Sequence, residues 1–272
     1  MSRIDKALEE AVRLREPRSA QPVIDAPAPD NGGFVPSSPY IVTLSDPSSP
    51  ITEEYRKLKS MIIKLTTKNT FRNTLMVTSS DSGEGKSVTS LNLAVILAQE
   101  YNHSVLLIDA DLRRPSLHRY FGIEPGKGLA DCLVSGIDAG SVIRKTGLPK
   151  LSFLTSGQTV RNPVELLSSL QMKKLLAELK QRYRDRYIII DTPPVLPFAE
   201  THAVSSLVDG VVFVVREGST SAKGLRGAFE MLQEAPILGV VLNAASVENL
   251  NGRFRYYKNY YGYLAEAGKQ AL

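Results

Sequence analysis

The sequence predicts an α/β fold in which a parallel sheet has helices on both faces. Several strand-like runs are continuously apolar, such as "YIIID" at 187–191 and "GVVFVV" at 210–215, and this pattern is typical of strands with both faces covered. Helical stretches separate these runs. Polar residues follow three of the runs directly, and in open parallel sheets ligands bind beyond the carboxyl ends of the strands.

The chain before the sheet divides into a helix and a linker. Residues 2–16 predict a short amphipathic helix with four apolar residues on one stripe, Ile4, Leu8, Ala11 and Val12. This helix is interpreted either as a terminal helix or as a docking helix for a partner or a membrane surface, although its balanced charge disfavours the membrane. Residues 17–50 contain eight of the sixteen prolines, which predicts an extended linker.

A second helix and the sheet domain follow. Residues 52–68 restore a helical period, with Thr52 as the expected N-cap and two acids in the first turn. We expect strands at 74–78, 105–109, 151–154, 187–191, 210–215 and 238–242. We expect further helices at about 86–100, 163–183, 198–206 and 219–233. The domain is predicted to span 51–250, and residues 251–272 are predicted to form a flexible tail.

Composition narrows the class of protein. A chain of 272 residues that is 43% hydrophobic can bury one sizeable core with terminal appendages. No apolar run reaches the roughly 18–20 residues of a membrane span, and the first residues do not resemble a secretory signal, so a cytoplasmic location is expected. The net charge of +5 permits binding to nucleic acid, but no basic helix with interleaved aromatic residues indicates it. Cys132 is expected to be a core residue.

A glycine-rich segment follows the first predicted strand and leads directly into a helix. This segment, "SSDSGEGKS" at 79–87, predicts a loop whose backbone N–H groups bind phosphate. Lys86 is expected to reach the β- and γ-phosphates, and the Ser87 hydroxyl is expected to bind Mg²⁺. The usual first glycine of such loops is replaced by Ser80. The residues predicted to contact the nucleotide are Ser82, Gly83, Glu84, Gly85, Lys86, Ser87 and Val88.

Carboxylates end two other predicted strands. Asp109 and Asp111 lie at positions i and i+2 in "LLIDADLRRP" and can therefore face one side. Asp191 ends "YIIID" and is expected to complete a Mg²⁺ site with Ser87. One acid of the Asp109–Asp111 pair can accept a proton from an attacking hydroxyl while the other holds metal. Alternatively, both are solvated turn acids, or one of them caps the next helix. His103, His118 and His202 lie outside any motif.

Tyrosines gather near the end of the chain. Five of the eleven lie in "RYYKNYYGY" at 255–263, and they are Tyr256, Tyr257, Tyr260, Tyr261 and Tyr263. Such a segment can be a phosphoacceptor, an aromatic packing segment, or a surface that stacks on sugar or nucleic acid. Its interspersed Arg, Lys, Asn and Gly residues are too polar and flexible for a core.

Together these motifs resemble the bacterial protein-tyrosine kinases of polysaccharide export, which are phosphate-loop (P-loop) NTPases of the MinD-like fold. The resemblance covers about residues 50–263 and rests on the phosphate loop, "LLIDADLRRP", "YIIIDTPPV", "GQTVRNPVELLSS", "VVFVVREGST", "GVVLN" and the tyrosine tail. The short N-terminal helix and lack of membrane spans look most like the stand-alone autokinases of exosortase-linked exopolysaccharide systems.

The resemblance implies an ATP- and Mg²⁺-dependent autokinase that phosphorylates its C-terminal tyrosines in a neighbouring subunit of a ring. It implies that Lys86, Asp109, Asp111 and Asp191 are catalytic, and that Ser87, Asp111 and Asp191 hold the metal. Which of Asp109 and Asp111 is the base stays open. Asn243 is either an adenine contact or a turn residue. Ser82 replaces the additional loop lysine of MinD relatives, which favours the kinase branch.

The resemblance also implies assembly and partners. "EEYRKLK" is similar to the family's oligomerisation motif at Glu53, Arg56 and Lys59, although a lysine at the last position loses bidentate pairing with carboxylates. Stand-alone members act with a membrane-spanning polysaccharide co-polymerase, or chain-length adaptor, which would recruit the chain to the membrane, and a cognate tyrosine phosphatase is expected. Two other functions stay open: a MinD- or ParA-like positioning ATPase, and a non-catalytic nucleotide-gated scaffold.

Overall fold

The structure, a computed structural model, describes residues 38–68, 70–182 and 185–246. The helix expected at 2–16, the first part of the linker and the tyrosine tail therefore lie outside the described residues. The described residues form a seven-stranded sheet with the strand order β3-β4-β2-β5-β1-β6-β7. Every neighbouring pair is parallel except β3 with β4. The predicted parallel sheet is thus confirmed.

The strands agree closely with the apolar runs of the sequence. They are β1 Thr74–Ser79, β2 Ser104–Asp109, β3 Arg144–Lys145, β4 Leu151–Leu154, β5 Arg186–Asp191, β6 Gly210–Arg216 and β7 Ile237–Asn243. Only the two-residue edge strand β3 was not expected, because two residues carry no period. The inner strands β1, β2 and β5 are buried along almost their whole length, as continuous apolar runs require.

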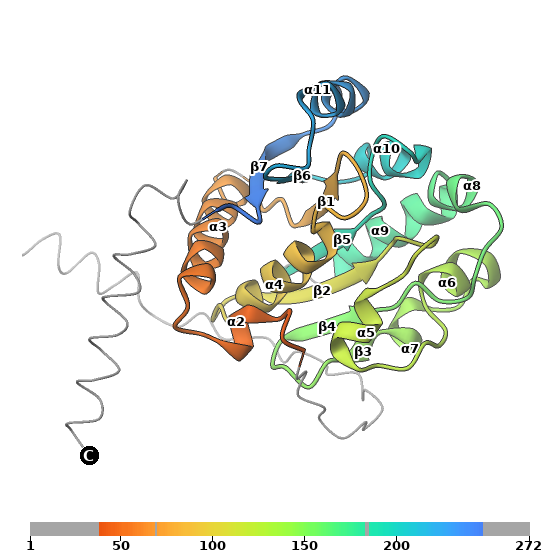
Figure 1. The fold of residues 1–272 in the computed structure, drawn as a ribbon. Helices are drawn as coiled ribbons and strands as arrows, with labels where there is room; N and C mark the ends of the chain where they lie inside the picture. The colour runs from red at the N-terminus through yellow and green to blue at the C-terminus, as the bar shows by residue number, and fades with distance from the viewer. Residues whose placement is uncertain (1–37, 69, 183–184, 247–272) are drawn as a thin grey trace, which may run out of the picture. The chain divides into compact units, whose positions relative to one another are not determined.

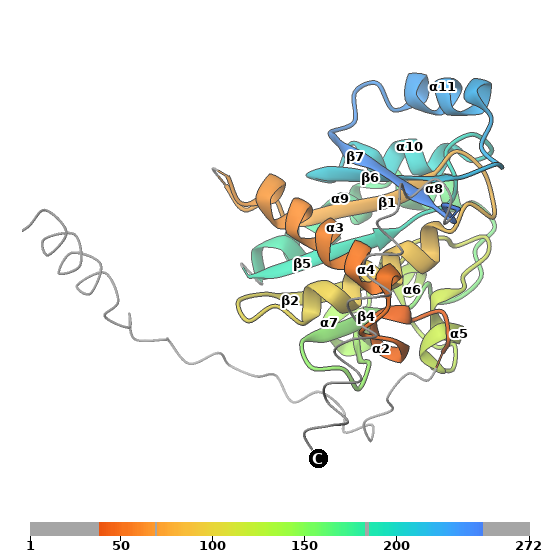
Figure 2. The ribbon, with the colours of Figure 1, turned by 60° about the vertical axis from the view of Figure 1, so that its left-hand side comes forward.

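Helices cover both faces of the sheet (Figures 1 and 2). One layer contains α3 Pro50–Thr66, α4 Lys86–Ala98 and α5 Leu117–Phe121. The other contains α6 Leu129–Ser135, α7 Ala139–Val142, α8 Pro163–Leu167, α9 Leu170–Arg182 and α10 Ala199–Ser205. In both views α11 Ala222–Met231 lies at the end of the sheet formed by β6 and β7. Cys132 is buried in the second layer, as predicted.

The helix expected at 52–68 begins earlier than predicted. Ser49 is its N-cap, since the Ser49 Oγ accepts a hydrogen bond from the Thr52 N–H at 3.1 Å. Pro50 occupies the first helical position, where no N–H is needed. The prediction that Thr52 caps the helix is wrong, because its hydroxyl is buried and donates instead to the carbonyls of Val42 and Asp46.

The final part of the expected linker belongs to the folded domain. Residues Val42–Ser45 form the short helix α2, and Ile41 is fully buried. The side-chain amide of Asn92 on α4 holds this segment by accepting from the Thr43 N–H and hydroxyl, at 3.1 and 3.0 Å, and by donating to the Tyr40 carbonyl at 2.8 Å. These contacts override the proline-rich composition, so the domain starts before residue 50.

The single helix expected at 163–183 is two helices, α8 and α9. Two serines separate them. The Ser168 hydroxyl donates to the Val164 carbonyl at 2.8 Å, and the Ser169 Oγ accepts from the Met172 N–H at 3.2 Å. Serine side chains thus compete with the helical backbone pattern at this point.

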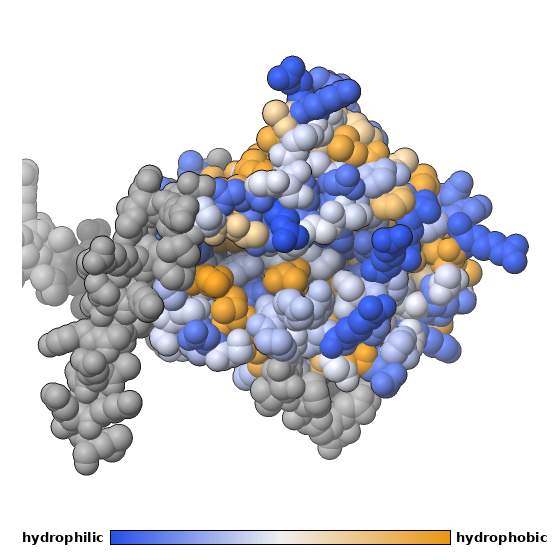
Figure 3. All heavy atoms as spheres, in the orientation of Figure 1, coloured by the Kyte–Doolittle hydropathy of each residue, from blue (hydrophilic) through white to orange (hydrophobic). Residues whose placement is uncertain are grey.

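The surface of the described residues includes exposed hydrophobic side chains. On the face in Figure 3, hydrophobic side chains are scattered in small groups among polar ones. No helix of the described part of the chain has both the length and the apolar character that crossing a membrane requires.

Candidate active site

Three adjacent strands bring the predicted motifs to one edge of the sheet. β1 lies between β5 and β6, and β5 lies between β1 and β2. Asp109 at the end of β2 pairs in register with Asp191 at the end of β5, and Asp191 also pairs with Val77 on β1, two residues before the glycine-rich loop begins. The loop and the acids, which are far apart in the chain, therefore meet at the carboxyl ends of the strands.

The loop adopts a conformation that depends on its glycines. Gly83 and Gly85 have φ angles of 82° and 92°, in the left-handed region that other residues rarely adopt. A Cβ atom on Gly85 would also lie 1.9 Å from the Asn243 Nδ2. α4 starts at Lys86, immediately after the loop, so the unpaired N–H groups of its first turn face the same site. This arrangement suits a phosphate group.

Lys86 lies among the acids of the site. Its Nζ is 3.1 Å from the Asp111 Oδ2 and 3.2 Å from the Ser87 Oγ. Burial alone would lower the pKa of Lys86, but the carboxylates of Asp191 and Asp111 outweigh it and raise the pKa above its ordinary value. The lysine therefore stays protonated and can pair with an anion.

Asp191 is buried with one oxygen unused. Its Oδ1 accepts a hydrogen bond from the Ser90 hydroxyl at 3.0 Å, whereas Oδ2 has no hydrogen bond of ordinary geometry within the described part of the chain. Burial raises the pKa of Asp191, while Lys86 and the hydroxyls of Ser87 and Ser90 oppose the increase. A buried carboxylate oxygen of this kind is suited to a cation or its water shell.

Mg²⁺ fits this donor set. The carboxyl groups of Asp109, Asp111 and Asp191 lie beside a single ammonium group, that of Lys86, in a buried site, so several oxygen atoms are available as ligands near one protein cation. Among the described residues no three His, Cys, Asp or Glu side chains form a ready-made metal cage. That is the usual situation for Mg²⁺, which keeps several waters and is bound by one or two protein ligands together with phosphate oxygens.

Asp109 and Asp111 have different surroundings. The Asp109 Oδ2 accepts from the N–H groups of Ser116 and Leu117, both at 3.1 Å, and its Oδ1 accepts from the Asp111 N–H at 3.3 Å. Both oxygens of Asp109 are thus used to hold the turn before α5. Burial and the neighbouring Asp191 raise the pKa of Asp109 to about 8. Asp111 is slightly more open, with one oxygen on Lys86 and the other accepting from the Arg114 N–H at 3.0 Å.

The remaining predicted contacts surround the loop. The Ser82 N–H donates to the Asp81 carboxylate at 2.7 Å, and the Val88 carbonyl accepts from Asn92. Asn243 ends β7, and its side-chain amide donates to the Glu84 carbonyl at 2.9 Å. Asn243 is therefore brought to the phosphate loop by the fold.

The predicted oligomerisation residues lie on α3. Arg56 pairs with Glu53 at 2.9 Å and also donates to the Pro47 carbonyl at 2.8 Å. Lys59 pairs within the chain with Glu100, which follows α4, at 2.5 Å. Lys59 thus links α3 to the end of α4. The five tail tyrosines lie outside the described residues.

Three residues that form ion pairs or hydrogen bonds around the site were not expected from the sequence. Arg113, two residues after Asp111, pairs with the buried Glu200 of α10 through a 2.5 Å contact of its Nε and stacks on the Phe198 ring at 4.8 Å. Arg216 ends β6, Thr220 lies four residues further along, and both contact the loop. An arginine and a hydroxyl residue at the end of a buried strand and in the turn after it, in "VVREGST", were the available signal.

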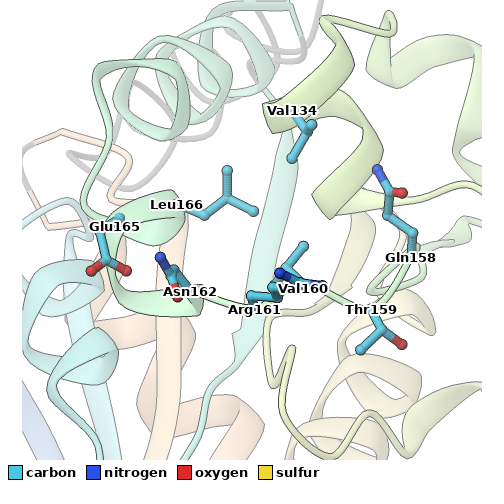
Figure 4. Close-up of a pocket in the computed structure, with 8 residues that line it drawn as sticks. All are labelled: Val134, Gln158, Thr159, Val160, Arg161, Asn162, Glu165 and Leu166. Carbon is cyan, nitrogen blue, oxygen red and sulfur yellow. The ribbon is translucent and has the colours of Figure 1, made fainter.

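A pocket of about 440 Å³ lies at the same edge of the sheet, beyond β4. The side chains of Val134, Val160 and Leu166 point toward it from α6, the β4–α8 loop and α8 (Figure 4). Gln158, Thr159, Arg161, Asn162 and Glu165 complete its lining. The carboxylate of Asp131 fixes one side of this pocket by accepting from the N–H groups of Gly128 and Gln158, at 2.9 and 3.2 Å.

Comparison with known proteins identifies the family of the chain. Residues 75–257 match the family described as the CobQ/CobB/MinD/ParA nucleotide binding domain. Tyrosine-protein kinase YwqD of Bacillus subtilis (strain 168) is 34% identical over 219 residues, covering 80% of this chain and 90% of YwqD. This chain belongs to the bacterial tyrosine-protein kinase family.

Solved structures of bacterial tyrosine kinases have the same fold as this kinase. The kinase domain of Escherichia coli tyrosine kinase ETK matches with a TM-score of 0.69 and 27% identity, covering 88% of this chain and 89% of that one. The chimerical protein CapA2B2 matches with a TM-score of 0.70 and 31% identity, covering 76% of the kinase described here and 90% of CapA2B2. The resemblance found in the motifs is thereby confirmed at the level of fold and family.

Proposed function

We propose that this chain is an ATP- and Mg²⁺-dependent protein-tyrosine autokinase that phosphorylates its own C-terminal tyrosines. The observation that supports this most directly is the position of Lys86 between a glycine loop and the acids Asp111 and Asp191. In a chain of the tyrosine-kinase family, that arrangement can hold a triphosphate beside a proton acceptor.

The loop residues 82–88 hold the nucleotide, and Ser87, Asp111 and Asp191 hold the metal. Bound Mg²⁺ supplies positive charge that offsets the charge developing on the transferred phosphoryl group. Lys86 exchanges its contact with Asp111 for one with phosphate. Asn243, whose amide lies against the Glu84 carbonyl, is the proposed contact to the base of the nucleotide.

Asp111 is the proton acceptor for the attacking phenol. A tyrosine hydroxyl has an ordinary pKa near 10 and becomes a good nucleophile only when its proton is removed during attack. Both Asp109 oxygens hold backbone N–H groups, so Asp109 acts by fixing the turn that carries Asp111. One Asp111 oxygen instead contacts the Lys86 ammonium group, and this oxygen becomes available when Lys86 turns to phosphate. We therefore favour Asp111 over Asp109 as the base.

The acceptors are Tyr256, Tyr257, Tyr260, Tyr261 and Tyr263, used by a neighbouring copy in a ring. Five tyrosines clustered among arginine, lysine, asparagine and glycine residues have no role in a positioning ATPase or a scaffold. α3, with Glu53 and Arg56, forms part of the contact between copies.

A membrane-spanning polysaccharide co-polymerase recruits the chain to the inner membrane face and activates it. A tyrosine phosphatase removes the phosphates again. No nucleic-acid partner is proposed.

Intact-mass and peptide mass spectrometry of the full chain tests the proposal. The chain is produced in bacteria and then supplied with ATP and Mg²⁺. Several phosphates on the peptide containing 255–263, absent from the Lys86→Met variant, are expected. Lys174→Met, which removes an exposed lysine of α9, is the matched control and should be phosphorylated normally. An unmodified tail, even with a candidate membrane activator present, contradicts the autokinase proposal.

The match to MinD- and ParA-type domains supports one second candidate, an ATPase that hydrolyses ATP without modifying protein. It predicts ATP turnover that depends on Lys86 and no phosphotyrosine. The same pair of variants, assayed for phosphate release, distinguishes the two.

A further inference from the structure

Glu84 is an unusual residue in the middle of an anion-binding loop. It is only 2% exposed, and buried glutamates are rare unless they are fully paired. Its carboxylate accepts hydrogen bonds from the Asp81 N–H at 3.0 Å, from the Ser80 hydroxyl at 3.3 Å and from the Thr220 hydroxyl through a very short contact. Two of these donors belong to the loop itself, and the third reaches across from the turn after β6.

The surroundings of Thr220 fix the direction of its hydroxyl. The Thr220 Oγ1 accepts from the Arg216 N–H at 3.0 Å, so its own hydrogen is free to point at the Glu84 carboxylate. The turn that presents the hydroxyl contains Gly218 with φ 71°, and the Thr220 N–H donates back to the Arg216 carbonyl at 3.1 Å. The Thr220 donor is therefore held in place before any ligand binds.

Two backbone carbonyls of the loop are held from the same side. The Arg216 Nη1 donates to the Gly83 carbonyl, and the Asn243 Nδ2 donates to the Glu84 carbonyl, both at 2.9 Å. In a planar trans peptide the C=O and the following N–H point in opposite directions. The N–H groups of Glu84 and Gly85 therefore point away from Arg216 and Asn243, and within the described residues neither has a hydrogen-bond acceptor.

We propose that Arg216, Thr220 and Asn243 form a clamp that positions the phosphate loop, keeping the N–H groups of Glu84 and Gly85 turned toward the phosphates. These residues act through Gly83 and Glu84, so Thr220 is a positioning residue. The clamp rests on the nucleotide-binding role of the loop. Since it orders the loop before binding, losing it weakens nucleotide affinity rather than the transfer step.

The test uses the full chain and Thr220→Val, which keeps the side-chain shape but removes the hydroxyl. Thr220→Ser keeps the hydroxyl, and Thr70→Val is the control at an exposed threonine before β1, at the other end of that strand. The dissociation constant for MgADP is measured by calorimetry. We expect about a 10-fold increase for Thr220→Val, as for one buried hydrogen bond to a charged group, and less than about a 3-fold change for the other two variants.

Hydrogen exchange of the ligand-free chain supplies the second readout. Peptides covering 80–88 should exchange faster in Thr220→Val and normally in Thr220→Ser. The clamp would be overturned if Thr220→Val and the unmodified chain had the same MgADP affinity and the same hydrogen exchange. It would also be overturned if Thr220→Val and Thr220→Ser lost MgADP affinity to the same extent. If Thr220→Val does not fold, the same exchange measurement is made on Arg216→Met, which changes an exposed side chain. Faster exchange of the peptides covering 80–88 would then support the clamp, and unchanged exchange would overturn it. Neither readout uses phosphotyrosine, so the clamp and the autokinase proposal fail separately.

Discussion

The ammonium group of Lys86 lies 3.1 Å from the carboxylate of Asp111, and both side chains are almost buried, at 12% and 9% exposed. The loop lysine is therefore held by an acid that must give up at least part of this contact when phosphate is bound. Asp111 consequently affects two steps in opposite directions, since it competes with phosphate for Lys86 and, by our proposal, accepts the phenol proton.

Replacing Asp111 should separate these two effects. In Asp111→Asn we expect metal-free ADP to bind about 3- to 10-fold more tightly, because a negative charge beside Lys86 is removed. We expect tail phosphorylation to fall at least 100-fold, because the proton acceptor and one of the metal ligands are lost together. Calorimetry and a phosphotyrosine assay measure the two quantities. Asp138→Asn, at an exposed acid of the α7 N-cap, should change neither. Weaker binding of metal-free ADP in Asp111→Asn would contradict the competition.

The buried acids should make stability depend on pH. Asp109 has a folded-state pKa of about 8, well above the ordinary value of 3.8 that it regains on unfolding. Between these values the folded chain binds more protons than the unfolded chain, so the free energy of unfolding falls as the pH rises through this window. We expect the melting temperature of the ligand-free chain to drop by a few degrees more between pH 6 and pH 8.5 than that of Asp109→Asn. Parallel curves for the two proteins would rule out this role of Asp109.

Asp191 should be harmful to stability and necessary for activity. Its buried Oδ2 has no hydrogen bond of ordinary geometry within the described part of the chain, and burial raises its pKa. Asp191→Asn removes the buried charge but keeps an oxygen for the Ser90 hydroxyl, so the ligand-free protein should melt a few degrees higher at pH 8. MgADP should then stabilise the variant much less than the unmodified chain, since a metal ligand is missing. Thermal scans with ADP alone and with MgADP give both results, and full MgADP stabilisation of the variant would remove Asp191 from the metal site.

Arg113 should contribute mainly to stability. It pairs through its guanidinium with Glu200, whose side chain is completely buried. Arg113→Ala leaves that carboxylate without its partner, at a cost of about 2 kcal/mol after allowing for the partly exposed arginine, or roughly 5 °C in melting temperature. Adding Glu200→Gln should recover most of the loss, because the unpaired charge is gone. Arg114→Ala, at the exposed neighbour, should melt like the unmodified chain. A double variant no more stable than Arg113→Ala would show that lost packing on Phe198, not charge, is the cause.

Motifs within one element were predictable, and contacts between elements were not. The apolar runs located β1, β2 and β5, and strand topology then placed Asp109 and Asp191 side by side. By contrast, the attachment of α2 depends on Asn92, which lies 49 residues beyond Thr43, and no local pattern predicts it. The same holds for Thr220 and Glu84, which are 136 positions apart. Residue preferences also gave a wrong prediction where two residues could both cap one helix, since Ser49 rather than Thr52 is the N-cap of α3.

Phosphorylation of the tail should change the assembly of the chain. Each phosphate adds about −1.5 to −2 charge, so five modified tyrosines would add roughly −8 to −10 to a segment that carries basic residues. A tail with that charge is repelled from a neighbour's site, which already holds acids and nucleotide phosphates, so the contact between copies that passes through the tail is lost. We expect the phosphorylated chain to have a smaller mass by light scattering than Lys86→Met under the same conditions, and phosphatase treatment to restore the larger species. The Tyr→Phe variant at all five positions should keep the larger mass with ATP and Mg²⁺ present. Equal mass before and after phosphorylation would contradict the prediction and would mean that contacts outside the tail, such as those of α3, hold the copies together.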